Sequence, residues 1–357
     1  MAATTLRLPG LSEAEVLGWL RECDAECLEY LWRTADAVRA AFVGDEVHLR
    51  GLLEISNYCV RRCAYCGISS LVPGVQRYRM TEEEILACAH SAVGLGYGTL
   101  VMQSGEDYGI GREWLSGVVR RVKHETPLAV TLSMGERPHE DLAAWREAGA
   151  DRYLLRFETS DRRLYALLHP PHGNRPSDRL AILRDLRTLG YEVGSGVMVG
   201  IPGQTYASLA HDICLFGELD LDMVGVGPYI RHPCTPLGSG AMGPGCEPSE
   251  QVPADELTTC KVIALTRLVC PEANIPSTTA LATLSGVRGR ELGLARGANV
   301  VMPNVTPLKH QVLYEIYPGK ACIAETADAC GACLTRRIES MGRRVGKGPG
   351  GRQRRSA

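Results

Sequence analysis

Short apolar runs and longer amphipathic segments alternate along most of the chain. Eight apolar runs have the length of strands, and they span 49–55, 99–103, 129–133, 153–157, 194–199, 223–226, 275–278 and 299–302. Several of them are continuously apolar, as in strands that are buried on both faces. Segments with helical spacing of apolar residues lie between them, at 82–95, 112–124, 139–148, 179–189, 206–219 and 255–268.

This alternation predicts an α/β fold. Strand and helix units that follow one another favour a parallel sheet with right-handed crossovers. Eight units predict a closed (β/α)8 TIM-type barrel, because the alternative, a doubly wound open sheet, usually needs fewer. In such barrels the chemistry lies on the loops after the strands. The residues at the strand ends are therefore the first candidates for a functional site.

Two extensions flank the predicted barrel. Before the first strand, Ser12 and Glu15 have the spacing of a capping box, and Leu28, Leu31 and Trp32 follow with helical spacing. From residue 336 onward the chain is basic and rich in glycine, which is typical of a solvated tail. The predicted organisation is an N-terminal helical extension over 1–44, a barrel over 45–310 and a C-terminal segment over 311–357.

Composition and charge add few constraints. The 357 residues are 45% hydrophobic and 22% charged, as in an ordinary globular protein. The formal net charge of −2 gives no sign of nucleic acid or a membrane surface as a partner. The first ten residues lack the pattern of a secretory signal, and no apolar stretch approaches the ~18 residues of a membrane span. We therefore expect a cytoplasmic protein.

Cysteine is the residue type that changes this picture. The chain has fourteen cysteines, and an intracellular chain of this length uses them for metal or redox chemistry rather than for disulfides. Eight are scattered and are expected to pack as small buried hydrophobes. The other six form two groups, Cys59 with Cys63 and Cys66, and Cys322 with Cys330 and Cys333.

The first group directly follows the first predicted strand. Three thiolates with the spacing of Cys59, Cys63 and Cys66 can bind three corners of a [4Fe–4S] cluster. The fourth iron is then open to a small chelator with an amine and a carboxylate. Zinc is the alternative, but structural zinc sites generally use four protein ligands, and this loop has no histidine or fourth cysteine. The pattern therefore favours an iron–sulfur cluster.

This cysteine pattern, with the aromatic Tyr65 before the third cysteine, resembles the motif of the radical S-adenosylmethionine (SAM) superfamily. The resemblance implies that a reduced cluster gives SAM one electron, so that SAM splits into methionine and a 5′-deoxyadenosyl radical. The segment 103–107 resembles the glycine–glycine–glutamate segment that binds the SAM ammonium, with Ser104 in place of the first glycine. A helix N-terminus with an acidic first turn is the alternative, but the position after the second strand favours SAM.

Longer motifs resemble one group within this superfamily, the HydE maturases of [FeFe]-hydrogenase. The resembling runs lie in order between about residues 45 and 350, at 102–107, 151–159, 198–205, 222–230 and 317–320. The resemblance implies a set of cofactor-binding residues, namely Tyr65, Gln103, Ser104, Glu106, Glu158 and Arg179. Among these, Arg179 is expected to bind the SAM carboxylate.

The same resemblance implies a pocket for a small carboxylate inside the barrel. Its candidate residues are Thr131, Arg156, Thr278, Thr279 and Tyr317. Hydroxyl groups and one guanidinium suit a carboxylate, although hydrogen bonding at strand ends is the alternative role of the threonines. We expect Arg156 to act with the three cluster cysteines as a catalytic residue.

The resemblance also implies an activity and partners. HydE-like proteins act on an iron–cyanide–carbonyl–cysteine complex that a partner maturase makes, and the adenosyl radical is thought to attack the cysteine sulfur. The expected partners are this organometallic substrate, the other hydrogenase maturases and an electron donor. The alternatives are a radical SAM amino-acid mutase of the methylornithine synthase type, a biotin synthase, an RNA-modifying radical enzyme, and a cluster carrier without catalysis.

The second cysteine group lies beyond the eighth predicted strand. Three thiolates at Cys322, Cys330 and Cys333 could bind an auxiliary [2Fe–2S] or [4Fe–4S] centre. Zinc or three free thiols are the alternatives. Some HydE-like proteins have these cysteines and others do not, so no catalytic role is expected for this group.

Overall fold

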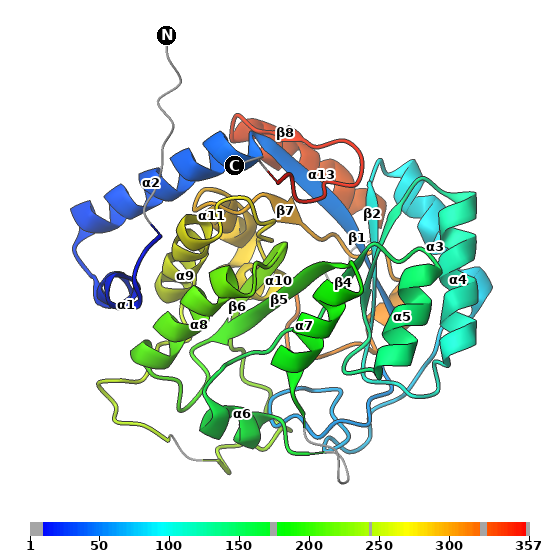
Figure 1. Ribbon diagram of the computed structural model, residues 1–357, viewed down its shortest axis with the longest axis horizontal. Helices are drawn as coiled ribbons and strands as arrows, with labels where there is room; N and C mark the ends of the chain where they lie inside the picture. Colours follow the sequence, from blue (N-terminus) through cyan, green and yellow to red (C-terminus); the bar gives the residue numbers. More distant parts are fainter. Residues whose placement is uncertain (1–9, 172–176, 243–244, 322–326, 355–357) are drawn as a thin grey trace.

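The computed structural model describes residues 10–171, 177–242, 245–321 and 327–354, with the backbone alone at 287 and 327–332. Within these residues, seven parallel strands form one sheet in the spatial order β6-β5-β4-β3-β2-β1-β7 (Figure 1). The strands are β1 (Glu46–Ser56), β2 (Thr99–Ser104), β3 (Ala129–Ser133), β4 (Arg152–Leu154), β5 (Glu192–Val199), β6 (Met223–Pro228) and β7 (Val300–Val301).

The segment 274–277 closes this sheet into a barrel. It forms parallel bridges with β6 at Met223 and Val226, and with β7 at Val300. It therefore takes the place of the predicted seventh strand, and β7, which pairs with β1, is the eighth. The prediction of a (β/α)8 barrel is confirmed.

The six predicted barrel helices are present, as α3 (Glu82–Gly94), α4 (Arg112–Glu125), α5 (His139–Glu147), α7 (Arg179–Thr188), α8 (Tyr206–Glu218) and α9 (Glu256–Val269). The sequence pattern misses five short helices, α6 (Arg162–Leu168), α10 (Thr279–Ser285), η1 (Gly286–Arg288), α11 (Gly289–Leu294) and α12 (Leu308–Gln311), and also the longer α13 (Ala327–Ser340). It also extends the fourth strand too far: β4 ends at Leu154, and Glu158, which has a positive φ of 66°, forms an isolated bridge to Val197 on β5.

The N-terminal extension consists of α1 (Glu13–Arg21) and α2 (Ala25–Val43). The predicted capping box is present: Glu15 N donates to Ser12 Oγ at 3.3 Å, and Ser12 N donates to Glu15 Oε2 at 2.8 Å. Helix α1 packs on α8 and α9, and α2 packs on α9. The extension therefore covers one side of the barrel (Figure 1). Within the described ranges, no helix is both long and apolar enough to cross a membrane.

Buried polar side chains line the inside of the barrel near the beginnings of the strands. Arg152 on β4 donates across β3 to Thr99 Oγ1 on β2, at 3.0 Å, and Arg50 on β1 contacts Met223 Sδ on β6, also at 3.0 Å. All three polar residues are buried. Because a buried polar group is costly without a partner, this end of the barrel needs further hydrogen-bond acceptors.

The C-terminal tail supplies these acceptors, so the prediction of a solvated tail is wrong for the residues up to 354. Strand β8 (Arg344–Val345) pairs with the start of β1, and the following residues cross the N-terminal end of the barrel. The carbonyl of Pro349 accepts from Thr99 and Arg152, and that of Gly350 accepts from Arg50. The sequence pattern could not show this docking, because the partners lie about 200 to 300 positions away.

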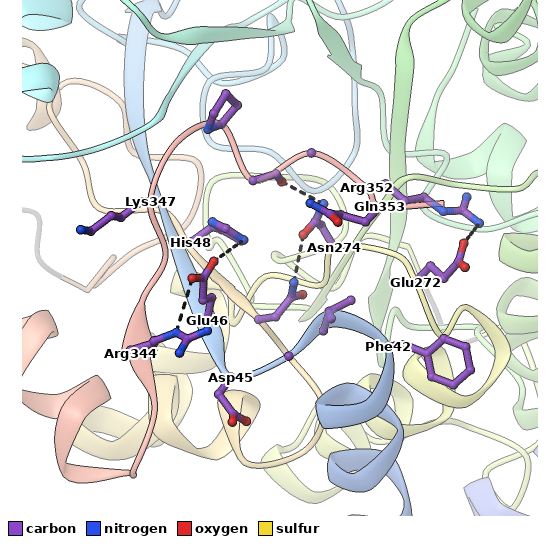
Figure 2. A pocket seen from close by; sticks show the side chains of 16 residues that line it. Phe42, Asp45, Glu46, His48, Glu272, Asn274, Arg344, Lys347, Arg352 and Gln353 are labelled. Carbon is purple, nitrogen blue, oxygen red and sulfur yellow. Dashed lines mark hydrogen bonds and ion pairs between the residues drawn. The ribbon is translucent and has the colours of Figure 1, made fainter. Parts of the chain in front are cut away.

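The glycines and arginines of the tail have specific contacts there. A Cβ at Gly346 or Gly350 would lie within 2.5 Å of the His48 ring, so glycine lets the tail pass this side chain. Arg352 pairs with Glu272 at 3.2 Å. A cavity of about 630 Å³ lies between the tail, the start of β1 and the end of α2 (Figure 2). The tail and the start of β1, which line this cavity, lie at the opposite end of β1 from the loop that follows that strand (Figure 1).

Candidate functional site

Cys59, Cys63 and Cys66 lie on the long loop that follows β1, at the C-terminal end of the barrel. Neighbouring segments hold this loop through its backbone: Val60 N donates to Glu106 O at 3.0 Å, and Ala64 N donates to Leu168 O at 3.0 Å. The cysteines therefore sit in a loop that is fixed both by the segment after β2 and by the end of α6.

The three thiols are close enough to affect one another electrostatically. Burial raises the pKa of each, that of Cys63 to about 11, and the negative charge of Cys59 adds to the effect at Cys63 and Cys66. Since thiolates are the form that binds metal, a bound cluster must compensate this burial. No three His, Cys, Asp or Glu side chains of the described part converge closely enough to hold a single metal ion. A cubane cluster is bound at separate corners, so its ligands need not converge in that way.

The segment after β2 packs directly on the cysteine loop. A Cβ at Gly105 would lie 2.3 Å from the carbonyl oxygen of Tyr58 and 2.8 Å from Cβ of Cys59, so only glycine fits this approach. Ser104 Oγ donates to the carbonyl of Gly105 at 2.6 Å. The structure thus brings Ser104 and Glu106 beside the cysteines, as the sequence motif predicts.

Glu106 is buried at this contact and has several partners. Its Oε2 accepts from the backbone N–H of Glu136 at 2.8 Å, its Oε1 accepts from the hydroxyl of Tyr108 at 3.0 Å, and Arg61 Nε lies 3.7 Å away. Burial raises the pKa of Glu106, whereas the positive charge of Arg61 lowers it. Glu106 is thus a carboxylate held in place with one cation beside it.

Glu136 is a buried charge that the sequence reasoning missed. Its Oε1 accepts from Arg61 at 2.7 Å, from Arg179 at 3.0 Å and from Ser177 at 2.5 Å. It therefore neutralises two arginines beside the cysteine loop and fixes their position. The signal was present in the sequence, since Glu136 follows the third strand by three residues and strand ends carry the chemistry of this fold.

Arg179, Glu158 and Tyr65 meet on the other side of the cysteine loop. Arg179 Nη1 donates to the carbonyl of Arg156 at 2.7 Å, and Arg156 Nη2 lies 3.2 Å from Glu158 Oε2. Burial raises the pKa of Tyr65, and the charges of Cys63 and Glu158 raise it further. The predicted cofactor-binding residues Tyr65, Glu158 and Arg179 therefore form one cluster with the cysteines.

The predicted substrate residues are more spread out. Thr131 faces the barrel interior from within β3, two residues before its end, in register with Arg152. Thr278 Oγ1 accepts from Leu281 N at 3.3 Å and so caps α10, while Thr279 is the first residue of that helix. Thr278 therefore has the alternative role, structural hydrogen bonding at a strand end. Thr131, in contrast, has a buried hydroxyl without a hydrogen-bond partner in the described chain.

A buried ion pair that was not predicted lies near the end of β1, at the same end of the barrel as the cysteine loop. Lys320 Nζ donates to Glu54 Oε1, and Asn304 Nδ2 donates to Glu54 Oε2 at 3.0 Å. Burial raises the pKa of Tyr317, and the charge of Glu54 contributes to this shift. Gln103, a predicted cofactor-binding residue, instead donates to the hydroxyl of Tyr314 at 3.2 Å.

The second cysteine group is described only in part. Cys322 lies outside the described residues, and only the backbone is described at Cys330. Cys333 is exposed on α13. The auxiliary centre therefore stays a prediction.

Comparison with known proteins gives the family. The model of the radical SAM superfamily matches residues 53–213. The [FeFe] hydrogenase maturase subunit HydE of Thermotoga maritima is 46% identical over 91% of this chain and 89% of its own. The chain belongs to the HydE family of radical SAM enzymes. Membership implies a [4Fe–4S] cluster and SAM as cofactors, and a role in hydrogenase maturation.

More distant relatives fit this assignment. The 3-methylornithine synthase of Methanosarcina acetivorans is 29% identical over 82% of this chain and 79% of its own. Among solved structures, methylornithine synthase PylB has a TM-score of 0.78 at 26% identity and covers 95% of each chain. The hydrogenase maturase HydG has a TM-score of 0.75 at 18% identity, over 94% of this chain and 73% of its own. The HydG likeness shows the fold alone.

The residues present fit a cluster with SAM. Several buried polar atoms around the cysteine loop make no hydrogen bond within the described chain, namely Arg61 Nε, Arg156 Nε and His169 Nδ1, and Glu158 Oε2 makes an ion pair with Arg156 but no hydrogen bond there. An amino acid needs a carboxylate for its ammonium group and a guanidinium for its carboxylate. Both kinds of side chain lie close to the cysteines and can still accept or donate further hydrogen bonds. This donor set suits the ammonium and carboxylate of SAM.

Proposed function

We propose that this protein cleaves SAM reductively to methionine and a 5′-deoxyadenosyl radical. We further propose that the radical acts on a cysteine-containing iron carbonyl/cyanide complex during assembly of the di-iron subcluster of [FeFe]-hydrogenase. The observation that carries the proposal is the packing of the Ser104–Gly105–Glu106 segment on the three-cysteine loop. A reduced [4Fe–4S] cluster at Cys59, Cys63 and Cys66 would supply the electron.

The chain's own residues bind and orient SAM in this proposal. Glu106 and Glu158 are the carboxylates for the ammonium group, because both are buried beside the cysteine loop. Arg179 is the guanidinium for the SAM carboxylate. Glu136 binds Nε of Arg179, and this ion pair holds the guanidinium in one orientation. Charge-assisted hydrogen bonds of this kind are stronger than neutral ones.

Arg156 is the candidate for binding the substrate carboxylate. Its side chain is about one-third exposed, and its Nη2 is 3.2 Å from Glu158. It therefore borders both the proposed SAM site and the barrel interior, where Thr131 has a free hydroxyl within the described chain. The fixed ion pair of Glu54 and Lys320 lies at the same end of the barrel. A cysteine-bearing substrate carries the carboxylate that this arrangement requires.

The other partners follow from this proposal. The substrate must come from another maturase, and the electron must come from a donor, since no other group of the described chain supplies one. We keep the auxiliary centre at Cys322, Cys330 and Cys333 as a separate prediction. Iron and sulfide counts of a Cys333→Ala variant, compared with the wild type after reconstitution, test it.

The experiment that tests the proposed function is SAM cleavage. The protein is reconstituted with iron and sulfide without oxygen, mixed with SAM and a strong reductant, and 5′-deoxyadenosine is quantified. We expect product from the wild type and none from Cys66→Ala, with Cys234→Ala, an exposed cysteine outside the loop, as the matched control. An assembled and reduced cluster that yields no product, with or without the iron complex, would reject the proposal in favour of a cluster carrier.

A further inference from the structure

His169 links the end of α6 to the cysteine loop. Two neighbouring residues make the contact: Leu168 O accepts from Ala64 N at 3.0 Å, and His169 Nε2 is 2.9 Å from the hydroxyl of Tyr65. Ala64 and Tyr65 directly precede Cys66. The end of α6 therefore holds the part of the loop that carries the third cysteine.

The imidazole of His169 is held tightly in this contact. His169 is 2% exposed. Its ring packs edge-on against the Tyr65 ring, with 5.5 Å between the centroids, and at a tilt against the Tyr165 ring, with 4.5 Å between the centroids. Burial lowers the pKa of His169, and the charges of Arg179 and Arg61 lower it further. A neutral imidazole has one donor and one acceptor, so the bond to Tyr65 fixes one ring nitrogen.

A chain of side chains continues from His169 to the charged part of the site. The hydroxyl of Tyr165 hydrogen-bonds Ser177 Oγ, and Ser177 Oγ donates to Glu136 Oε1 at 2.5 Å. Glu136 in turn binds Arg179 at 3.0 Å. The position of Tyr65 and the position of Arg179 are thus linked through α6 and the residue that follows it.

We propose that His169 is a positioning residue for SAM, which holds the hydroxyl of Tyr65 so that the cysteine loop and Arg179 keep the spacing that SAM binding requires. This inference rests on the proposed function, because it assigns the residue to the same site. Within the described chain His169 makes no hydrogen bond to a cysteine, because its Nε2 lies beside the Tyr65 hydroxyl and its Nδ1 has no partner. Its loss therefore changes the affinity for SAM rather than the cluster content.

The test compares four single variants and the His169→Phe/Tyr65→Phe double variant of the reconstituted protein. His169→Phe removes the hydrogen bond and keeps the ring, whereas His169→Gln keeps a polar group at the reach of Nε2. Tyr65→Phe removes the same bond from the other side. His90→Phe is the control, since His90 is exposed on α3. Iron and sulfide per chain, circular dichroism and thermal unfolding establish that each variant is folded and loaded.

The decisive readout is a SAM titration of the electron paramagnetic resonance signal of the reduced cluster, which needs no cleavage. We expect His169→Phe to weaken SAM binding on the order of fivefold to tenfold, as for the loss of one hydrogen bond. Tyr65→Phe should match it, the double variant should be no worse, and His169→Gln should restore most of the affinity. The rate at saturating SAM should change little.

Wild-type affinity in His169→Phe, or effects of the two single variants that add up in the double variant, would overturn the inference. A loss of cluster with unchanged affinity of the loaded fraction would also overturn it, because the role would then be purely structural. Failure of the wild type to cleave SAM is a different result. That result would contradict the proposed function, and the SAM titration would still show whether His169 affects SAM binding.

Discussion

Gly105 is the point where the segment after β2 touches the cysteine loop, and we predict that Gly105→Ala disrupts the site. The added Cβ would lie 2.3 Å from the carbonyl oxygen of Tyr58 and 2.8 Å from Cβ of Cys59. Because even close carbon–oxygen contacts stay near ~3.3 Å, one of the two segments must move by about 1 Å. Overpacking of this kind costs ~1–3 kcal/mol of folding free energy. A displacement of ~1 Å at a reacting centre can lower the rate ~100-fold.

The matched control is Gly117→Ala. Gly117 lies within α4, where an added Cβ meets nothing within 4 Å, and alanine favours the helix by ~1 kcal/mol. Thermal unfolding, iron and sulfide content, and the initial rate of 5′-deoxyadenosine formation are measured for both variants. We expect Gly105→Ala to lose stability and most of the rate, and Gly117→Ala to keep both. Wild-type cluster content and rate in Gly105→Ala would refute the assigned contact.

Three further predictions concern charges. Glu136→Gln removes the charge that holds Arg179, and a SAM titration should show affinity at least ~10-fold weaker; unchanged affinity would contradict this role. Burial raises the pKa of Asp212 to about 7, so the folded chain keeps a proton that the unfolded chain releases near pH 4, and the free energy of unfolding falls as pH rises from about 4 to 7. Chemical unfolding should show Asp212→Asn gaining ~2–4 kcal/mol on the wild type over that range, and a constant difference would refute it. Truncation before Gly346 removes the acceptor of the buried Arg50, and calorimetry should show a loss of ~1–3 kcal/mol, whereas an unchanged melting temperature would contradict the docking of the tail.

The barrel could be predicted from the sequence because its signals are local. Each apolar run and each amphipathic helix is recognised within about ten residues, and their order alone gives the parallel sheet. The cysteine loop is also local, since its three cysteines lie within eight positions. The fourth strand was overextended because apolar residues continue as far as Phe157, whereas β4 ends at Leu154.

The rest of the site depends on contacts between distant positions. Glu136 binds Arg61 across 75 positions, and His169 meets Tyr65 across 104; no periodicity relates such pairs. The docking of the tail could not be predicted for the same reason. A basic, glycine-rich end is typical of solvated segments, and only the structure shows that its carbonyl groups accept hydrogen bonds from residues such as Arg50. The short helix α6 was missed although it places His169, the residue that follows it, since seven residues give too little periodicity.

In vitro maturation shows whether this chain performs the radical SAM step of hydrogenase maturation. An immature [FeFe]-hydrogenase is incubated with the other maturases, SAM, a reductant and this protein, and hydrogen evolution is measured. We expect hydrogen evolution with the wild type and none with Cys66→Ala. Equal hydrogen evolution with Cys66→Ala, or none with the wild type while the Thermotoga maritima relative supports it, would rule out this role.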